Sequence, residues 1–286
     1  MKRLIYIILN YITYQDTIKI SEEIYPYLEE EDCILIVDNK SPNESSKELH
    51  RVFDGNEKVE VIDSPENGGY AKGNNYGLRY VQKYKPEYVC IINNDVHFTK
   101  ETISKLMEIY PKLEKPALIS PIQKLPDGSN MFFAEFRVPN IIYDLRMNSM
   151  LFPPKRHVYT SNTSLSNVQK VGYIPGAFLF TNYDVFRNIG FFYDKTFLFC
   201  EERFTGKMVE KVGLNNYIIL DLSYIHEHSK TIRNEASEKR QRELIHEGRK
   251  LYYSHFSRFP AINNFILSIS FYFHECELNF IKLIRR

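Results

Sequence analysis

The feature that most constrains the fold is an alternation of short apolar runs with helical patterns over about the first hundred residues. The apolar runs are rich in β-branched residues, which is typical of strands, and the segments between them carry apolar residues at helical spacing. The expected strands are Leu4–Asn10, Cys33–Val37, Val59–Ile62 and Tyr88–Ile92, and the expected helices are Thr17–Leu28, Ser45–Phe53 and Tyr70–Tyr84. Because parallel strands need crossovers, this order predicts an α/β fold with a mostly parallel central sheet flanked by helices.

The second half of the chain is less regular. Residues Pro121–Lys170 are rich in proline, asparagine and serine, which predicts a variable excursion with long loops. The elements expected around this excursion are helices at Thr99–Leu113, Tyr183–Asn188 and Glu201–Val212, and strands at Ala117–Ser120, Val171–Thr181 and Tyr217–Leu220.

Residues 232–286 are expected to form a helical C-terminal extension. A charged helix from Ser237 to about Phe256 precedes an apolar stretch, Asn264–Arg286, which ends in three basic residues. Such a helix fits either a membrane interface or a docked position on the core or on a second subunit of a homodimer. No stretch is as apolar and long as a helix that spans a bilayer.

Composition excludes several classes of protein. The chain has 37 Lys and Arg against 36 Asp and Glu, so we expect no nucleic-acid partner. Its four cysteines form no CxxC pair, which argues against disulfides and a thiolate zinc site. The N-terminal apolar run Leu4–Leu9 is too short for a signal peptide, so a cytoplasmic protein is expected.

Polar side chains follow three of the expected strands at the point where each strand ends. They are Asn10, Asp38, and the triplet Asn93, Asn94 and Asp95. Ligands of open α/β sheets bind beyond the carboxyl ends of the strands, which is where these side chains are expected. Their oxygen atoms suit Mg²⁺ or Mn²⁺ that shares its other positions with substrate phosphates. Each motif alone also fits a polar turn or a helix cap.

A glycine-rich segment, Asn67–Gly77, opens the third expected helix. Its glycines at every fourth residue are Gly69, Gly73 and Gly77. Since a glycine costs a helix interior about 1 kcal/mol relative to alanine, a packing or ligand reason is expected. A smooth face would let the helix press on the sheet, while Lys72 and the helix N-terminus could face a phosphate.

Two adjacent acidic residues, Glu201 and Glu202, follow the aromatic run Phe197–Phe199 at the expected start of a helix. At least one is expected near apolar groups, where desolvation raises the pKa of a carboxyl group and makes it a better base near neutral pH. The pair also fits a simpler role, because acidic residues in a first turn interact favourably with the helix dipole.

Two histidines, His226 and His228, come after the last expected strand. On an extended chain their rings would point to the same side, so both are expected near the site and one of them as a ligand. Histidines at such positions are more often surface or hydrogen-bonded core residues.

The order of these motifs resembles family 2 glycosyltransferases with a GT-A (Rossmann-like) fold, and most closely the bacterial rhamnosyltransferase-like members that build capsule, O-antigen or other cell-surface polysaccharide. The motifs in chain order are ILNY, IVDNKS, ENGGYAKGNNYG, CIINNDV, IPGAFLF, FLFCEERFTGKMVEKVG and IHEHSKT, over roughly Leu4–Thr231. The resemblance implies a domain over residues 1–231, with a donor-binding half at about 1–120 and an acceptor-side half at about 121–231.

The resemblance also implies an inverting transfer from a nucleotide-diphosphate sugar, such as dTDP-rhamnose or a UDP-sugar, to a saccharide or lipid-linked acceptor. Asp38 would hold the nucleobase, Asp95 and His226 would bind the metal, and Glu202 would be the catalytic base. The other residues implied to line the donor pocket are Asn10, Tyr11, Asn67, Gly69, Lys72, Asn93 and Asn94. The chain departs from the family pattern where Asn93 and Asn94 replace acidic residues and where Glu202 replaces an aspartate.

The leading hypothesis is therefore a cytoplasmic glycosyltransferase, peripheral on the inner face of the plasma membrane, that uses Mg²⁺ or Mn²⁺. A sugar nucleotidyltransferase is the first alternative, although Asn10–Tyr14 lacks the glycine-rich basic loop such enzymes carry after their first strand. A glycoside hydrolase with Asp95 and Glu202 flanking the scissile bond is the second. A sugar-binding subunit with a decayed site is the third.

Overall fold

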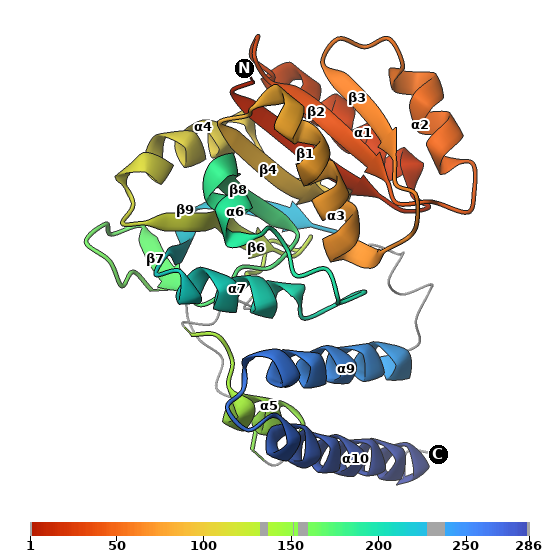
Figure 1. Ribbon diagram of the computed structural model, residues 1–286, viewed down its shortest axis with the longest axis vertical. Coiled ribbons are helices and arrows are strands. Elements are labelled where there is room, and N and C mark those ends of the chain that lie inside the picture. Colours follow the sequence, from red (N-terminus) through yellow and green to blue (C-terminus); the bar gives the residue numbers. More distant parts are fainter. Residues whose placement is uncertain (1, 132–136, 151, 154–159, 228–237, 285–286) are drawn as a thin grey trace.

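The computed structural model of the chain describes residues 2–131, 137–150, 152–153, 160–227 and 238–284. Figure 1 shows a twisted central sheet covered by helices, with two long helices, α9 (Glu238–Phe256) and α10 (Pro260–Ile284), packed together beyond it. The expected α/β fold and the helices at the C-terminal end are confirmed. Within the described residues, no helix combines the length and the apolar character needed to cross a bilayer.

The first four strands form a parallel sheet, as predicted. They are β1 (Leu4–Asn10), β2 (Cys33–Asp38), β3 (Val59–Asp63) and β4 (Tyr88–Asn93), in the order β3-β2-β1-β4. The helices between them are α1 (Tyr14–Ile24), α2 (Ser45–Phe53) and α3 (Gly69–Tyr80). Asn10 pairs with Asp38 and Leu9 with Asn93, so this register brings the polar strand ends to one edge of the sheet.

The rest of the sheet is mixed, so "mostly parallel" describes only the strands β1 to β4. Beyond β4 the order is β8-β6-β9-β5, in which only β6 and β9 are parallel, and β7 pairs with β9. These strands are β5 (Val96–His97), β6 (Pro116–Lys124), β7 (Val168–Val171), β8 (Phe178–Asn182) and β9 (Asn215–His226). The single strand predicted at Val171–Thr181 is wrong: a loop containing Pro175 and Gly176 separates β7 from β8. Pro175 has no N–H to donate to a ladder, which favours a break there.

Helices cover both faces of the sheet. In β1, Tyr6 and Ile8 belong to the core under α1, α2 and α4 (Lys100–Ile109), whereas Ile5 and Ile7 belong to the core under α3, α6 (Tyr183–Ile189) and α7 (Glu201–Lys211). Successive side chains of a strand point to opposite faces, so a strand buried on both sides is apolar at every position. That requirement explains the continuous apolar runs from which the strands were predicted.

The glycines of α3 allow this helix to lie directly on the sheet. A Cβ on Gly73 would come within 2.7 Å of Leu9, and a Cβ on Gly77 within 2.8 Å of Val37. Real Cβ contacts are longer than this, so any larger residue would push the helix off β1 and β2. The packing explanation for the repeated glycines is confirmed at these two positions.

The helical extension is joined to the domain by a buried cluster of charges. Asp144 of α5 (Ile141–Met147) is fully buried, with Arg203 of α7 donating to its Oδ1 at 2.7 Å and Arg249 of α9 lying 3.2 Å from the same oxygen. Tyr253 of α9 also donates to Asp144. Burial alone would raise the pKa of Asp144, but the two guanidinium groups and Tyr253 hold it below its usual value. One carboxylate therefore fastens three helices together.

Candidate active site

The ends of β1 and β2 are tied together by the carboxylate of Asp38. Its Oδ2 accepts hydrogen bonds from Asn10 Nδ2 and Ser41 Oγ, both at 2.7 Å, and its Oδ1 accepts one from the Ser41 backbone N–H at 2.8 Å. Asn10 and Asp38 are both buried. Tyr11, which follows Asn10, is half-buried. The proposed nucleobase contact of Asp38 would use the acceptor capacity that remains on Oδ1.

At the end of β4, the side chains of Asn94 and Asp95 differ in the hydrogen bonds that they make. The Asn94 amide donates to Thr13 Oγ1 at 2.8 Å and to Thr17 Oγ1 at 2.9 Å, which fastens β4 to the start of α1. Asp95 is buried, and neither of its carboxylate oxygens makes a hydrogen bond within the described residues. A buried carboxylate that accepts no hydrogen bond is unusual and indicates a group that can take a further ligand.

The pairing of β5 with β9 brings His226 beside Asp95. Val96 pairs with His226, and the Nε2 atom of His226 lies 3.1 Å from Oδ1 of Asp95 and 3.5 Å from the Asn93 amide nitrogen. The other ring nitrogen of His226 faces the Gln123 amide nitrogen at 3.0 Å. The second histidine, His228, lies outside the described residues.

This donor set fits a divalent cation in part. A carboxylate, an imidazole and a neighbouring amide can each supply a ligand, and substrate phosphates would fill the other positions. In the part of the chain that the structure describes, no three His, Cys, Asp or Glu side chains gather closely enough to hold a metal by themselves. The substrate would therefore have to supply the remaining ligands of the metal.

Gln123 was not predicted as part of the site, because β6 extends four residues beyond its expected end at Ser120. Tyr224 donates a hydrogen bond to Gln123 Oε1 at 3.0 Å, which turns the Gln123 amide nitrogen toward His226. A metal on Nε2 would move the ring proton to the other nitrogen, and the Gln123 amide would then have to turn its oxygen toward the ring. Gln123 is thus placed to orient the histidine.

The N-terminus of α3 is already capped by protein. The Tyr70 N–H donates to the carbonyl oxygen of Phe197 at 3.1 Å, so it is not available to a phosphate in this structure. Gly69 has φ +77°, and a Cβ there would lie 1.8 Å from the same carbonyl oxygen. Asn67 Oδ1 accepts from the Gly69 N–H at 3.1 Å and from the Asn39 amide, while Lys72 forms an exposed ion pair with Glu66.

Glu202 begins α7 opposite Tyr70 and the loop before β8. Its Oε1 accepts from the Gly176 N–H at 3.4 Å, and the Tyr70 hydroxyl donates to the Gly176 carbonyl oxygen. Burial raises the pKa of Glu202 above the usual value for a glutamate. This is the environment expected for a general base that works near neutral pH.

Glu201 lies beside Glu202 and is the more deeply buried of the two acids. The side chain is buried, and its Oε2 has no hydrogen-bond partner within the described residues. Burial first, and then the charge of Glu202, raise the pKa of Glu201 well above its usual value. Tyr70 lies against this pair: burial and the charges of both glutamates raise the pKa of its hydroxyl.

Replacing Glu201 with glutamine is expected to stabilise the protein at pH 8. An unfolded glutamate has a pKa of about 4.3 and loses its proton before the buried one does, so wild-type stability falls as pH rises from there to the raised pKa. Glutamine stays neutral, so the gain should be near zero at pH 4 and about 1–3 kcal/mol at pH 8. Melting temperatures across this range measure it, with exposed Glu57→Gln as control. A variant less stable than wild type at pH 8 would contradict the account.

Four non-glycine residues near this edge of the sheet have positive φ. Ile12 and Lys40 follow β1 and β2, each with φ 58°, and Phe199 and Cys200 precede Glu201 with φ 69° and 68°. Such conformations cost on the order of 1–3 kcal/mol each and collect at functional sites. The sequence does not predict these positive φ angles, because none of the four residues is a glycine.

The predicted site residues lie in one connected region. The Asn93 N–H donates to the Ala177 carbonyl oxygen at 3.0 Å, and the adjoining Gly176 N–H contacts Glu202, so the loop before β8 links the Asp95 and Glu202 sides. Asn39, next to Asp38, donates to the Gly69 carbonyl oxygen and so links β2 to the start of α3. Hydrogen bonds through backbone and side chains thus connect the ends of β1, β2 and β4 with the starts of α3 and α7.

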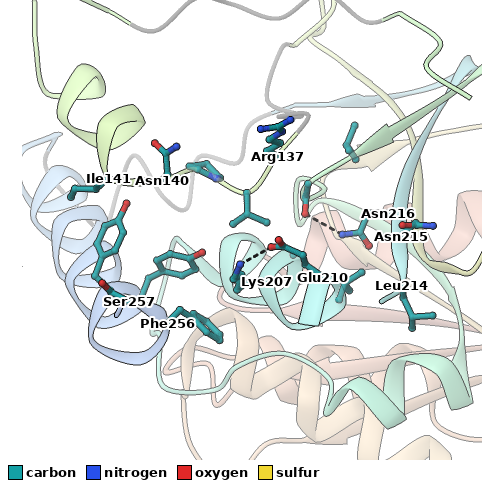
Figure 2. A pocket seen from close by; sticks show the side chains of 18 of the residues that line it. Arg137, Asn140, Ile141, Lys207, Glu210, Leu214, Asn215, Asn216, Phe256 and Ser257 are labelled. Atoms are coloured by element: carbon teal, nitrogen blue, oxygen red, sulfur yellow. Dashed lines mark hydrogen bonds and ion pairs between the residues drawn. The ribbon is translucent and has the colours of Figure 1, made fainter. Parts of the chain in front are cut away.

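A cavity of about 820 Å³ lies elsewhere, between the second half of α7, β7 and the helical extension. Figure 2 shows Asn216, Phe256 and the ion pair between Lys207 and Glu210 around it. None of the residues predicted for the donor, the metal or catalysis lines this cavity. It is separate from the network described above.

Solved structures with the same fold hold nucleotides or nucleotide sugars. GalNAc-T7 with UDP, GalNAc and Mn²⁺ has a TM-score of 0.63 at 12% identity, covering 98% of this chain and 57% of that one. The mannosyltransferase PcManGT from Pyrobaculum calidifontis, with GDP-Man and Mn²⁺, has a TM-score of 0.62 at 13% identity over 97% and 74% of the two chains. S. aureus TarS with UDP-GlcNAc has a TM-score of 0.58 at 12% identity over 93% and 70%. At these identities the likeness shows the fold alone.

Sequence comparison supports the same relationship. The chain is 26% identical over 205 residues to the low-salt glycan biosynthesis hexosyltransferase Agl10 of Haloferax volcanii. The match covers 68% of this chain and 58% of that relative's length. Residues 20–172, more than half of the chain, match the sequence model of the family described as glycosyl transferase family 2. The chain therefore belongs to glycosyl transferase family 2.

Proposed function

We propose that this chain is an inverting glycosyltransferase that moves one sugar from a nucleotide-diphosphate sugar to a saccharide or lipid-linked acceptor. The observation that carries the proposal is the buried Asp95 carboxylate, which lacks a hydrogen-bond partner among the described residues and lies in the network that also holds Glu202. Nucleotide sugars in two structures of the same fold, UDP with GalNAc in a third, and Mn²⁺ in two of the three support this choice of substrate class and cofactor.

On the donor side, Asp95 and His226 would hold Mg²⁺ or Mn²⁺, with Asn93 beside them. The cation would neutralise charge on the diphosphate as it leaves. Asp38, Asn10, Tyr11 and Asn94 would shape the nucleoside end of the site at the ends of β1, β2 and β4. Asn67, Gly69 and Lys72 would form its wall at the start of α3.

On the acceptor side, Glu202 would remove the proton from the attacking hydroxyl. The hydroxyl oxygen forms the new bond to the anomeric carbon from the face opposite the diphosphate. The bond from that carbon to the phosphate oxygen breaks, and its electron pair leaves with the nucleoside diphosphate. The Gly176 N–H, itself positioned through Tyr70, orients the Glu202 carboxylate toward this task.

The proposal also covers the donor sugar, the kind of glycan and the place of action. We propose a rhamnosyltransferase-like member that uses dTDP-rhamnose or a UDP-sugar in cell-surface polysaccharide synthesis, and acts at the inner face of the plasma membrane. The relative from Haloferax volcanii is named a glycan biosynthesis hexosyltransferase, which supports glycan synthesis and favours no single sugar.

A transfer assay tests the proposal. The purified chain is incubated with dTDP-, UDP- and GDP-sugars, Mn²⁺ and saccharide or lipid-linked acceptors, and the products are identified by mass spectrometry and NMR. The expected product is the acceptor extended by one sugar with inverted anomeric configuration, together with a nucleoside diphosphate. Pyrophosphate release would instead indicate nucleotidyl transfer, and a product with retained configuration would remove the inverting mechanism.

A further inference from the structure

Helix α10 carries a stripe of large apolar side chains that faces outward. Its outer face, defined as Ile262, Phe265, Ile269, Tyr272, Phe273 and Phe280, is made of large apolar side chains that are each at least 42% exposed. Their spacing places them on one side of the helix over about 27 Å. A stripe of this kind normally faces the core of a soluble protein.

The side of α10 that faces the protein carries polar contacts as well as Leu267, which is fully buried, and Phe271, which stacks on His246 of α9. Glu275 receives a hydrogen bond from Arg242 of α9 at 3.1 Å, and the Asn264 amide donates to Ser254 Oγ of α9 at 2.8 Å. Both contacts fix the rotation of α10 about its axis. The outward position of the exposed apolar residues therefore follows from specific polar and apolar contacts on the inner side of the helix.

The neighbouring helix also exposes apolar side chains. Helix α5, which packs against α10, exposes Ile142 by 65% and Met147 by 44%. Soluble monomers rarely expose a contiguous apolar patch of more than a few hundred Å², and larger patches mark sites of interaction with proteins or membranes. An occupant of the outer face is therefore expected.

The charges around this face favour a lipid surface. From Ser257 onward the sequence contains four basic residues, namely Arg258 before α10 and Lys282, Arg285 and Arg286 among the last five residues of the sequence, against only two acids. One of these acids, Glu275, is neutralised by Arg242. Helices that pair with a second helix usually carry charged residues beside the apolar seam, whereas an apolar aromatic face with basic ends suits anionic headgroups.

We propose that α10 lies in the interface of an anionic membrane, with its outer face buried at the boundary of headgroups and acyl chains. This inference rests on the proposed glycosyltransferase function, and it selects a lipid-linked acceptor over a free saccharide. The helix binds as a surface element, in keeping with the finding that no described helix is long and apolar enough to span a bilayer.

The active site would be coupled to this membrane contact through α9. The Cys200 thiol donates to the Ile245 carbonyl oxygen of α9 at 3.6 Å, and a Cβ on Gly248 of α9 would lie 2.9 Å from Cys200. Cys200 comes two residues before Glu202. Membrane-bound α10 would thus hold the base in a fixed position relative to the bilayer surface.

Vesicle flotation of the full chain tests the inference. Wild type and Ile269→Glu/Phe273→Glu are mixed with phosphatidylcholine vesicles, with or without a quarter phosphatidylglycerol. Wild type is expected to float with the anionic vesicles, and the double variant at least about tenfold less, because both new charges lie on the outer face. Val52→Glu/Val212→Glu, which adds two charges at exposed positions of α2 and just after α7, is the matched control and should float like wild type.

Each other outcome overturns the inference. Wild type that stays with the soluble fraction has no such membrane contact, and equal flotation of the double variant assigns binding to another surface. If wild type does not float but sediments as a dimer, and the double substitution dissociates that dimer, the outer face binds a second copy of the chain. Unchanged melting temperature confirms that the variant folds; if it does not fold, Tyr272→Gln/Phe273→Gln replaces it. Flotation requires no turnover, so a failed transfer assay leaves this result standing.

Discussion

Replacing Glu202 with glutamine is expected to lower the turnover number for sugar transfer by about a thousandfold while donor affinity stays within about twofold of wild type. The amide keeps an oxygen that can accept the Gly176 hydrogen bond, so the start of α7 should keep its position. It cannot take a proton from the acceptor hydroxyl. Turnover at saturating donor and a separate donor titration measure the two effects.

The pH profile sharpens this prediction. Burial raises the pKa of Glu202, and only the ionised carboxylate acts as a base, so wild-type turnover should rise with pH through that raised pKa. The residual rate of Glu202→Gln should lose this rise. Glu201→Gln is the matched control, because it removes the neighbouring buried acid and should keep most of the turnover. A Glu202→Gln variant with more than about a tenth of wild-type turnover would assign the proton transfer to another group.

Replacing Asp144 with asparagine is expected to lower the free energy of unfolding by about 3–5 kcal/mol. The substitution preserves shape but leaves Arg203 and Arg249 as buried cations without a balancing charge. Since Asp144 joins α5 to α7 and α9, the helical extension should detach at a lower temperature than the sheet unfolds.

Calorimetry measures both transitions. Glu101→Gln, which removes an exposed ion pair with Lys105 on α4, is the control and should melt like wild type. If Asp144→Asn melts at the wild-type temperature, the buried cluster is not what holds the extension in place.

The parts of the fold set by local patterns could be predicted from sequence, and the parts set by distant contacts could not. The parallel strands β1 to β4 followed from alternating β and helical periods, and the close packing of α3 from Gly73 and Gly77. The antiparallel insertion of β8 between β4 and β6 depends on a pairing between segments far apart in the chain. Periodicity carries no information on such a pairing, so the sheet was expected to be more parallel than it is.

The candidate site divides in the same way. Sheet topology brought Asn10, Asp38 and Asp95 to one edge, as the rule for strand ends predicts. The Tyr70 N–H donates a hydrogen bond to the Phe197 carbonyl oxygen, which is more than a hundred residues away in the sequence. The expectation that this helix terminus faces a phosphate therefore does not describe this structure. The ligand roles of all these residues stay predictions.

Titration of nucleotide sugars with and without Mn²⁺, in wild type and in Asp95→Asn, tests whether Asp95 takes part in metal-dependent donor binding. At least one dTDP-, UDP- or GDP-sugar is expected to bind wild type in a Mn²⁺-dependent manner, and Asp95→Asn is expected to weaken this binding at least about tenfold. The fold should be unchanged, because asparagine has nearly the shape of aspartate and keeps an Oδ1 atom that can remain beside His226 Nε2, 3.1 Å away. Donor binding of equal strength in both proteins, or in wild type without any metal, would contradict this expectation.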